Sequence, residues 1–157
     1  MELTMGGNNM KEIIIKKANK YRLPPQLVRA IIKVESSNNN YAIRYEKNYR
    51  WLYKPEKFAG ALQTLDTEKY MQKCSLGLMQ VMGAVAREHG CDDTFLSKLF
   101  DPEINLEYGC KYLSILKRRF GDMTDCIAAY NAGSPRKLDD GSYVNQKYVD
   151  RVLKNWK

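Results

Sequence analysis

The segment PPQLVRAIIKVES, residues 24–36, predicts a helix that ends on a carboxylic acid. Pro24 and Pro25 suit the first positions of a helix, where a missing backbone N–H costs nothing. Ser37 and the three Asn residues after it break the pattern, so we expect the helix to end at Glu35 and Ser36. The apolar side chains between these limits recur at helical spacing, at Leu27, Val28, Ile31, Ile32 and Val34.

A glutamate at the end of an apolar helix is suited to acid catalysis. Low polarity around a carboxyl group favours its protonated form, which holds a proton ready for a leaving group. Glu35 alone does not decide the function, because a glutamate in a last helical turn is usually solvated. The other segments of the chain have to supply the context.

Most of the remaining sequence also predicts helices. The alternation typical of a strand occurs only in the Tyr-rich residues 41–53, and no repeat, low-complexity segment or linker interrupts the chain. We therefore predict one mainly α domain over residues 1–157. The further helical segments are residues 10–21, 77–89 closed by Gly90, 101–121 opened by Asp101 and Pro102, 124–131 and 144–156.

Composition supports a single core but does not name a partner. The 157 residues are 44% hydrophobic and 28% charged, which excludes a disordered or fibrous chain. The net charge of +8 indicates either an anionic partner (nucleic acid, membrane or cell wall) or simply a solvated basic surface. No apolar run reaches the roughly 18 to 20 residues of a membrane span. Met1 to Asn9 lacks the features of a secretory signal, so we expect none.

The four cysteines do not have the spacing of a zinc site. They lie 16 to 19 residues apart, with no CxxC pair. We favour buried free thiols, and two disulfides are the alternative if the protein works outside the cell. We expect no metal and no organic cofactor. The residues concerned are Cys74, Cys91, Cys110 and Cys126.

Short motifs in a fixed order resemble the soluble lytic transglycosylase (SLT) family, relatives of goose-type lysozyme. The resemblance runs from about Ala18 to Leu153 and implies a lysozyme-like helical domain. The motifs are Glu35-Ser36, then GLMQVM at 77–82, DPEINL at 101–106 with Gly109 and Tyr112-Leu113, AAYNAG at 128–133, and Tyr148-Val149 with Val152-Leu153.

The resemblance implies a reaction and its catalytic residues. Glu35 matches the family's catalytic acid, which protonates the β-1,4 glycosidic oxygen between N-acetylmuramic acid and N-acetylglucosamine in peptidoglycan and then acts as base. The C6 hydroxyl of the substrate is the nucleophile and leaves a 1,6-anhydro end. Tyr130 matches the tyrosine whose hydroxyl contacts this glutamate; an aromatic core residue is the alternative.

Other matched positions imply contacts with the sugar. Gln80 matches a polar group of the cleft and Met82 an apolar one, although both also fit a buried helix. Asn131 and Tyr148 match further cleft positions. Ser75 is a candidate for substrate contact or a plain turn serine.

The chain departs from the family in a long segment, residues 38–73, which we call the insert. Within it, Arg44-Tyr45-Glu46 resembles a segment that follows the catalytic glutamate in some phage-type muramidases. Glu46 is then a candidate second carboxylate that holds a water and makes the enzyme an inverting hydrolase. The alternative is a surface acid paired with a nearby Lys or Arg, and Asp66 is a weaker candidate for the same role.

The aromatic residues of the insert have two interpretations. They offer flat faces to sugar rings, or they pack the insert against the rest of the chain. The residues are Tyr45, Tyr49, Trp51 and Tyr53. The single histidine, His89, is placed near a helix end, where its charge is favourable, and we assign it no catalytic role.

A non-catalytic binding module is the alternative from another class, either for cell-wall glycan or for nucleic acid. Glu35, Gln80 and Tyr130 together favour an enzyme, because a binder needs no acid at a helix end. No nucleic-acid-binding motif accompanies the positive charge, so we expect no nucleic-acid partner. We expect a monomer that acts on peptidoglycan strands in the periplasm or outside the cell, and that is phage-encoded, exported by another route or excised from a larger protein.

Overall fold

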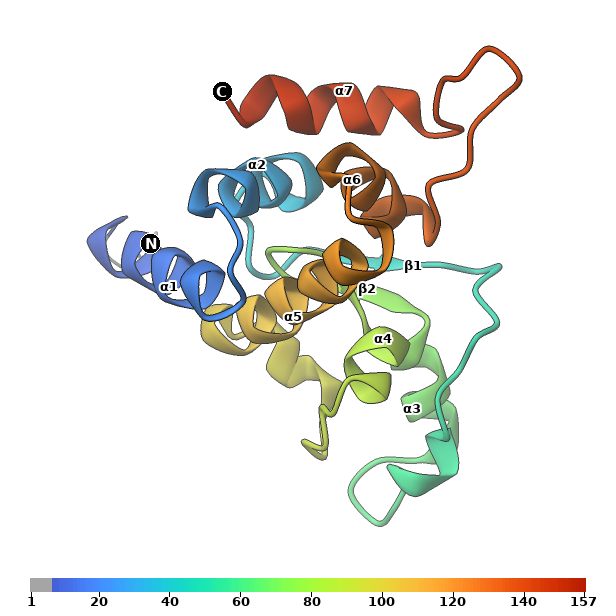
Figure 1. The fold of residues 1–157 in the computed structure, drawn as a ribbon. Helices are drawn as coiled ribbons and strands as arrows, with labels where there is room; N and C mark the ends of the chain where they lie inside the picture. Colours follow the sequence, from blue (N-terminus) through green and yellow to red (C-terminus); the bar gives the residue numbers. More distant parts are fainter. Residues whose placement is uncertain (1–6) are drawn as a thin grey trace. The chain divides into compact units, whose positions relative to one another are not determined.

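The computed structural model describes residues 7–157, and its elements are drawn in Figure 1. The expectation of no secretory signal depends largely on residues 1–6, which lie outside the described part. The helices are α1 (Gly7–Lys20), α2 (Pro25–Ser36), α3 (Leu65–Gln72), α4 (Gly83–Glu88), α5 (Pro102–Phe120), α6 (Met123–Ala132) and α7 (Gln146–Asn155). The strands are β1 (Ile43–Tyr45), β2 (Cys74–Leu76) and β3 (Val81–Met82), and two short 3-10 turns are η1 (Pro55–Lys57) and η2 (Leu96–Phe100).

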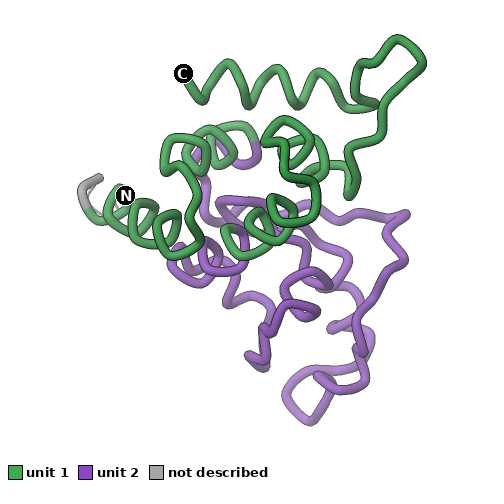
Figure 2. The backbone as a smooth tube through the Cα atoms, in the orientation of Figure 1, with its two compact units in different colours: residues 1–34, 110–157 green, residues 35–109 purple. Residues whose placement is uncertain are grey.

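The mainly helical fold class is confirmed. The chain forms two compact units, coloured separately in Figure 2: unit 1 contains residues 1–34 and 110–157, and unit 2 contains residues 35–109. The organisation as one domain stays a prediction. Across the described residues, no helix is long and apolar enough to cross a membrane.

Unit 1 is built from amphipathic helices. The helix predicted over residues 24–36 is confirmed as α2, and all of its apolar side chains up to Ile32 are buried. α6 begins at Asp122, whose side chain accepts a hydrogen bond from the Asp125 N–H, and ends at Gly133 in the left-handed conformation. α7 packs against α6, as Figure 1 shows, and buries Val149 and Val152. The two predicted C-terminal helices are therefore confirmed.

Unit 2 contains a small antiparallel sheet in the order β1-β2-β3. Its central strand, β2, is completely buried. Only three residues of the stretch 41–53 form a strand, so the predicted Tyr-rich strand is confirmed for β1 alone. The sequence analysis did not identify β2, β3 or α3.

The predicted helix over residues 77–89 is wrong in its first half. Residues 77–80 form a turn, Val81 and Met82 form β3, and the helix α4 begins only at Gly83. Gly77 and Gln80 have φ angles of +73° and +48°, which a right-handed helix does not allow.

A buried asparagine holds this turn in place. Asn105 is fully buried, and its Oδ1 accepts a hydrogen bond from the Met79 N–H at 2.8 Å. Its Nδ2 donates to the carbonyl oxygens of Leu76 at 2.8 Å and Leu99 at 2.9 Å. The DPEINL motif on α5 therefore fixes the GLMQ turn.

The four cysteines are free and buried in the structure. Burial raises the pKa of the thiols of Cys74, Cys91 and Cys126, and the negative charge of Glu46 adds to the effect at Cys74. The preference for buried free thiols is confirmed, and the alternative of two disulfides is not realised in this structure.

Two glycines with similar positive φ angles, +73° at Gly77 and +76° at Gly121, provide a matched test of the turn. A Cβ on Gly77 would lie 2.4 Å from Asn105 Nδ2 and 2.6 Å from the Leu99 oxygen, whereas a Cβ on Gly121, with φ +76°, would meet nothing within 4 Å. We expect Gly121→Ala to cost about 1 to 2 kcal/mol of unfolding free energy from the left-handed backbone alone. Gly77→Ala should cost about 2 to 5 kcal/mol because overpacking adds to that penalty. Urea unfolding followed by circular dichroism measures both, and equal losses would contradict the account of the turn.

Candidate active site

The proposed acid lies where the sequence placed it. Glu35 is in the last turn of α2 and is half-buried. Ser36 ends the helix, and Ser37 and Asn38 follow with φ angles of +52° and +67°. These left-handed residues turn the chain away from the helix axis and into the insert.

Three of the predicted site residues lie together on one face of the sheet. Ser75 pairs with Arg44 of β1 and with Met82 of β3, so the side chains of Arg44, Ser75 and Met82 share a face. The Ser75 hydroxyl lies 3.2 Å from Met82 Sδ and 3.4 Å from Glu46 Oε1. The structure therefore brings Glu46, Ser75 and Met82 into one cluster, which we call the sheet-face cluster.

Glu46 is held in this cluster from both its backbone and its side chain. Its N–H donates to the Lys73 carbonyl oxygen at 2.8 Å. Its Oε1 accepts a hydrogen bond from Arg44 Nε at 2.6 Å, and the carboxyl side chain is 31% exposed. The pairing of Glu46 with a nearby basic residue is thus present, and so is its contact with Ser75. Asp66, the weaker candidate, is exposed in the first turn of α3.

Gln80 braces the turn that carries it. Its Nε2 donates to the carbonyl oxygens of Ala42 and Gly77, both at 3.0 Å. The Gly77 N–H also donates to the Ala42 oxygen, at 2.7 Å. These bonds tie the GLMQ turn to the residue before β1. Because Nε2 of Gln80 already donates two bonds within the protein, a contact of this side chain with substrate would use its amide oxygen.

The other predicted site residues belong to unit 1. Tyr130 on α6 is half-buried, and its ring lies 5.5 Å from that of Tyr112. Asn131 is exposed, and its Oδ1 accepts a hydrogen bond from Asn145 Nδ2 at 2.9 Å. Tyr148 is only 6% exposed on the packed side of α7, which limits any direct contact with a ligand. The roles of these residues stay predictions.

The sequence analysis missed the residues that anchor the insert. Glu68 of α3 and Arg87 of α4 are both fully buried and form a two-pronged ion pair, with Nε to Oε1 at 2.7 Å and Nη2 to Oε2 at 2.9 Å. Gln63 and Gln72 donate to the same carboxylate, and the Arg87 guanidinium stacks 4.0 Å from the Phe58 ring centroid. A charged residue on a buried helix face gives no apolar period, so no sequence signal marked this pair.

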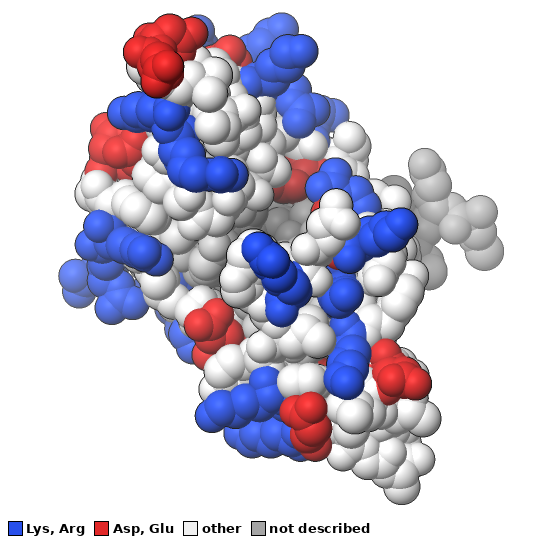
Figure 3. All heavy atoms as spheres, turned by 90° about the vertical axis from the view of Figure 1, so that its right-hand side faces the viewer, with Lys and Arg blue, Asp and Glu red and all other residues white. Residues whose placement is uncertain are grey.

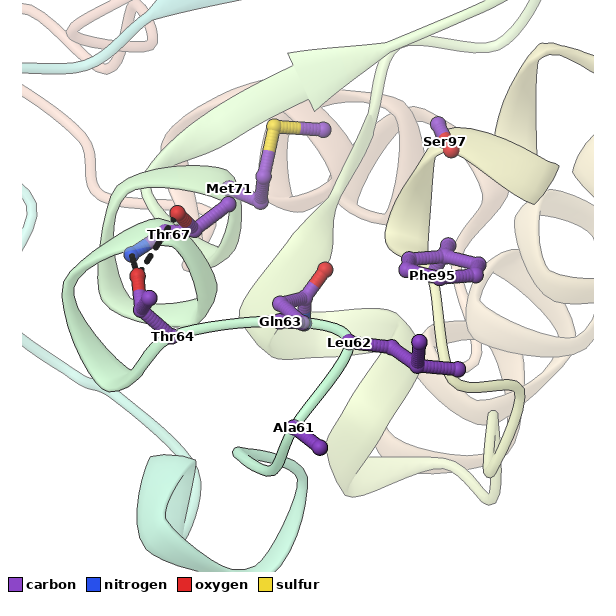
Figure 4. Close-up of a pocket in the computed structure, with 8 residues that line it drawn as sticks. All are labelled: Ala61, Leu62, Gln63, Thr64, Thr67, Met71, Phe95 and Ser97. Atoms are coloured by element: carbon purple, nitrogen blue, oxygen red, sulfur yellow. Dashed lines mark hydrogen bonds between the residues drawn. The ribbon is translucent and has the colours of Figure 1, made fainter.

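A pocket of about 360 Å³ lies in unit 2, and the sheet-face cluster does not line it. Figure 4 shows Leu62 and Phe95 on one side of it and Met71 with Thr67 on another. Among the described residues, no group of three His, Cys, Asp or Glu side chains is arranged to hold a metal ion.

A helical body with an acid at the end of α2 and a small sheet beside the GLMQ turn defines a lysozyme-like protein. The family model of the transglycosylase SLT domain matches residues 12–151. The chain therefore belongs to this family.

Named relatives and a solved structure agree with the family. Membrane-bound lytic murein transglycosylase E of Buchnera aphidicola is 28% identical over 118 residues, which cover 71% of this chain and 41% of that protein. Membrane-bound lytic murein transglycosylase C of Edwardsiella ictaluri is 28% identical over 157 residues, 85% of this chain and 35% of that protein. The chain thus spans about two fifths or less of the length of these relatives.

The fold is that of a lytic transglycosylase of known structure. An inactive mutant of the lytic transglycosylase Slt from Pseudomonas aeruginosa matches with a TM-score of 0.60 and 20% identity. The match covers 97% of this chain and 23% of that one. At this identity the likeness establishes the fold alone.

The buried ion pair gives a test of how the insert is held. Arg87→Met leaves Glu68 as an uncompensated buried charge, and we expect a loss of about 3 to 5 kcal/mol in unfolding free energy. Adding Glu68→Met removes that charge as well and should restore a large part of the loss. Chemical denaturation of the two single variants and the double variant measures the coupling. Additive losses would contradict a direct pair.

Proposed function

We propose that this chain is a lytic transglycosylase that cleaves the β-1,4 bond between N-acetylmuramic acid and N-acetylglucosamine, with Glu35 as general acid and base. The observation that carries the proposal is the half-buried position of Glu35 at the end of α2, within the segment that matches the family. The names of the relatives, which act on murein, support the same substrate. Neither a metal nor an organic cofactor is needed.

The proposed reaction is an internal displacement. The Glu35 carboxyl group gives its proton to the glycosidic oxygen as the bond from this oxygen to the anomeric carbon breaks. The C6 hydroxyl of the same muramic acid forms a new bond to the anomeric carbon and loses its proton to the Glu35 carboxylate. No water is consumed, and the enzyme returns to its starting state. A positioned internal hydroxyl can reach an effective molarity of about 10⁵ M or more.

The remaining predicted residues have supporting roles in this proposal. The hydroxyl of Tyr130 orients the Glu35 carboxyl group. Gln80, Met82, Ser75, Asn131 and Tyr148 contact the sugar or support residues that do. Asn145 is added to this set as a positioning residue, because its Nδ2 bonds both to Asn131 Oδ1 and to the Ala128 carbonyl oxygen.

The charge of the chain supports an anionic polymer as the partner. Unit 1 contains 17 Lys or Arg residues against 7 Asp or Glu, whereas unit 2 contains 9 against 11. Figure 3 shows one face of the molecule on which basic side chains cover more surface than acidic ones.

We propose that a monomeric chain works at the bacterial cell wall, delivered by a phage, by a dedicated export route or as part of a larger protein. Its attraction to the wall weakens as salt screens the charges.

Substitution of the acid tests the proposal. We expect Glu35→Gln to lower the rate of cell-wall lysis about 10²- to 10⁴-fold, the usual contribution of a general acid. Glu88→Gln is the matched control, because Glu88 is an exposed glutamate in the last turn of α4. Loss of turbidity of purified peptidoglycan measures both. Full lysis by the Glu35→Gln protein would overturn the catalytic assignment, and absence of lysis by the native chain would favour a binding module.

A hydrolase with Glu46 as second carboxylate is the alternative, and one observation favours it. Glu46 lies in the sheet-face cluster beside Met82, which the family resemblance assigns to the cleft, and beside Ser75, a candidate for substrate contact. An inverting hydrolase requires a carboxylate that holds a water on the far side of the sugar, about 6.5 to 9.5 Å from the acid.

The products distinguish the two reactions. For the proposed transglycosylase, we expect the released muropeptides to have 1,6-anhydro ends, lighter than reducing ends by one water, both from the native chain and from Glu46→Gln. Mass spectrometry of the digest makes the measurement, with Glu56→Gln, at an exposed acid of the insert, as the control. Reducing ends that disappear in Glu46→Gln would instead establish the hydrolase.

A further inference from the structure

A largely exposed aromatic ring lies in the segment of the insert that follows β1. Trp51 is 67% exposed, and its neighbour Tyr49 is half-buried with its ring edge-on, 5.5 Å away at 72°. Residues 46–54 form no helix or strand. A tryptophan with most of its ring in water is costly to solvate and is suited to a ligand with an apolar face.

This segment is held at both ends although it has no regular structure. At its start, the Glu46 N–H donates to the Lys73 oxygen, and the Tyr49 N–H donates to the Glu46 oxygen at 3.0 Å. At its end, the side chain of Gln72 bonds to both backbone groups of Tyr53, with distances of 2.8 Å and 3.0 Å. Gln72 is itself fully buried and bonded to Glu68. Trp51 is therefore displayed from a constrained backbone, which lowers the entropy lost on binding.

Tyr45, another aromatic residue of the insert, is engaged differently. Tyr45 pairs with Cys74 across the sheet, so it lies on the face opposite the Arg44, Ser75 and Met82 row. Its ring stacks on that of Tyr70, with centroids 4.5 Å apart and planes inclined by 6°. One face of the Tyr45 ring is therefore covered by Tyr70, whereas Trp51 is 67% exposed.

Positive charge surrounds this ring. The Arg50 guanidinium carbon lies 5.4 Å from the centroid of the Trp51 ring, and Lys47, Arg50 and Lys54 are all exposed. No acidic residue occurs between Glu46 and Glu56 in the sequence. An apolar ring face beside cations fits a saccharide with an anionic substituent, because hexose C–H groups pack on the ring and Arg pairs with a carboxylate.

We propose that Trp51, with Arg50 beside it, is a glycan-binding platform that holds a carboxylate-bearing sugar of the strand away from the bond that is cut. This inference rests on the proposed function for the identity of the glycan. Trp51 follows Glu46 by five residues, so the platform lies within about 17 Å of the sheet-face cluster along the chain. It extends the binding surface into the insert, where the family resemblance assigns no sugar contact.

Binding measured without catalysis tests the platform. The parent is Glu35→Gln, and sedimentation with insoluble peptidoglycan gives its affinity. We expect Trp51→Ala in this background to bind about tenfold more weakly, as is usual for removal of an aromatic anchor. Trp51→Phe should retain part of the affinity. Leu62→Ala, which removes another exposed apolar side chain of the insert, is the control and should bind like the parent.

Fluorescence reports on the ring directly, because the chain has two tryptophans. Trp156→Phe in the Glu35→Gln background leaves Trp51 as the sole indole, and its emission should shift on titration with soluble oligosaccharides of alternating N-acetylglucosamine and N-acetylmuramic acid. Trp51→Phe, which leaves Trp156, should show no shift. The effect should be weaker with N-acetylglucosamine oligomers, which lack the carboxylate.

The outcomes separate this inference from the proposed function. Parent-like binding by Trp51→Ala, unchanged emission of Trp51 at saturating oligosaccharide, or a parent that does not bind overturns the platform, whatever the activity of the native chain. Weaker binding by Trp51→Ala together with no lysis by the native chain would retain the platform and overturn the transglycosylase. Circular dichroism of each variant confirms that the fold is intact.

Discussion

The arrangement of unit 2 depends on one buried amide. The side chain of Asn105 accepts a hydrogen bond from the Met79 N–H and donates to the carbonyl oxygens of Leu76 and Leu99. This single side chain therefore joins α5, the GLMQ turn and η2. Each of these backbone groups, if buried without a partner, would cost about 1 to 3 kcal/mol. The bonds hold the chain in the left-handed turn that sends β2 into β3. Without this reversal, Ser75 would not lie opposite Met82, and the sheet-face cluster would not form.

A second constraint holds the insert to this frame. A segment of this length without fixed contacts would be a mobile loop, but the Glu68 carboxylate receives bonds from Arg87, Gln63 and Gln72 in a site that excludes water. A buried ion pair adds little net stability, because desolvation offsets the attraction. Its effect is geometric, since only one placement of α3 satisfies both charges. This placement also fixes Gln72, and through it the segment that carries Trp51.

The sequence predicted the elements whose signals are local and not those that depend on distant partners. α2, α5 and α6 have apolar spacing and end signals in or next to their own residues, such as the Pro residues that begin α2 and Asp101 and Pro102 at the start of α5. Residues 77–82 have the same apolar spacing as a helix, and the choice between helix and turn is made by Asn105, more than twenty residues away. α3 was missed because its buried side consists of Glu68 and Gln72. The contact of Ser75 with Glu46 requires the strand register, which local patterns do not specify.

The contacts of Glu46 bear on which nucleophile the site favours. Transglycosylation uses a hydroxyl already attached to the sugar, and its effective molarity of about 10⁵ M or more exceeds that of any water that is not held in place. Hydrolysis therefore needs a carboxylate organised around a water. In this structure Oε1 of Glu46 is occupied by Arg44 and lies beside Ser75, so a water would have to be held by Oε2 alone or displace Arg44. The ion pair thus disfavours Glu46 as a base that activates water. The C6 hydroxyl of the substrate is therefore favoured over water as the nucleophile.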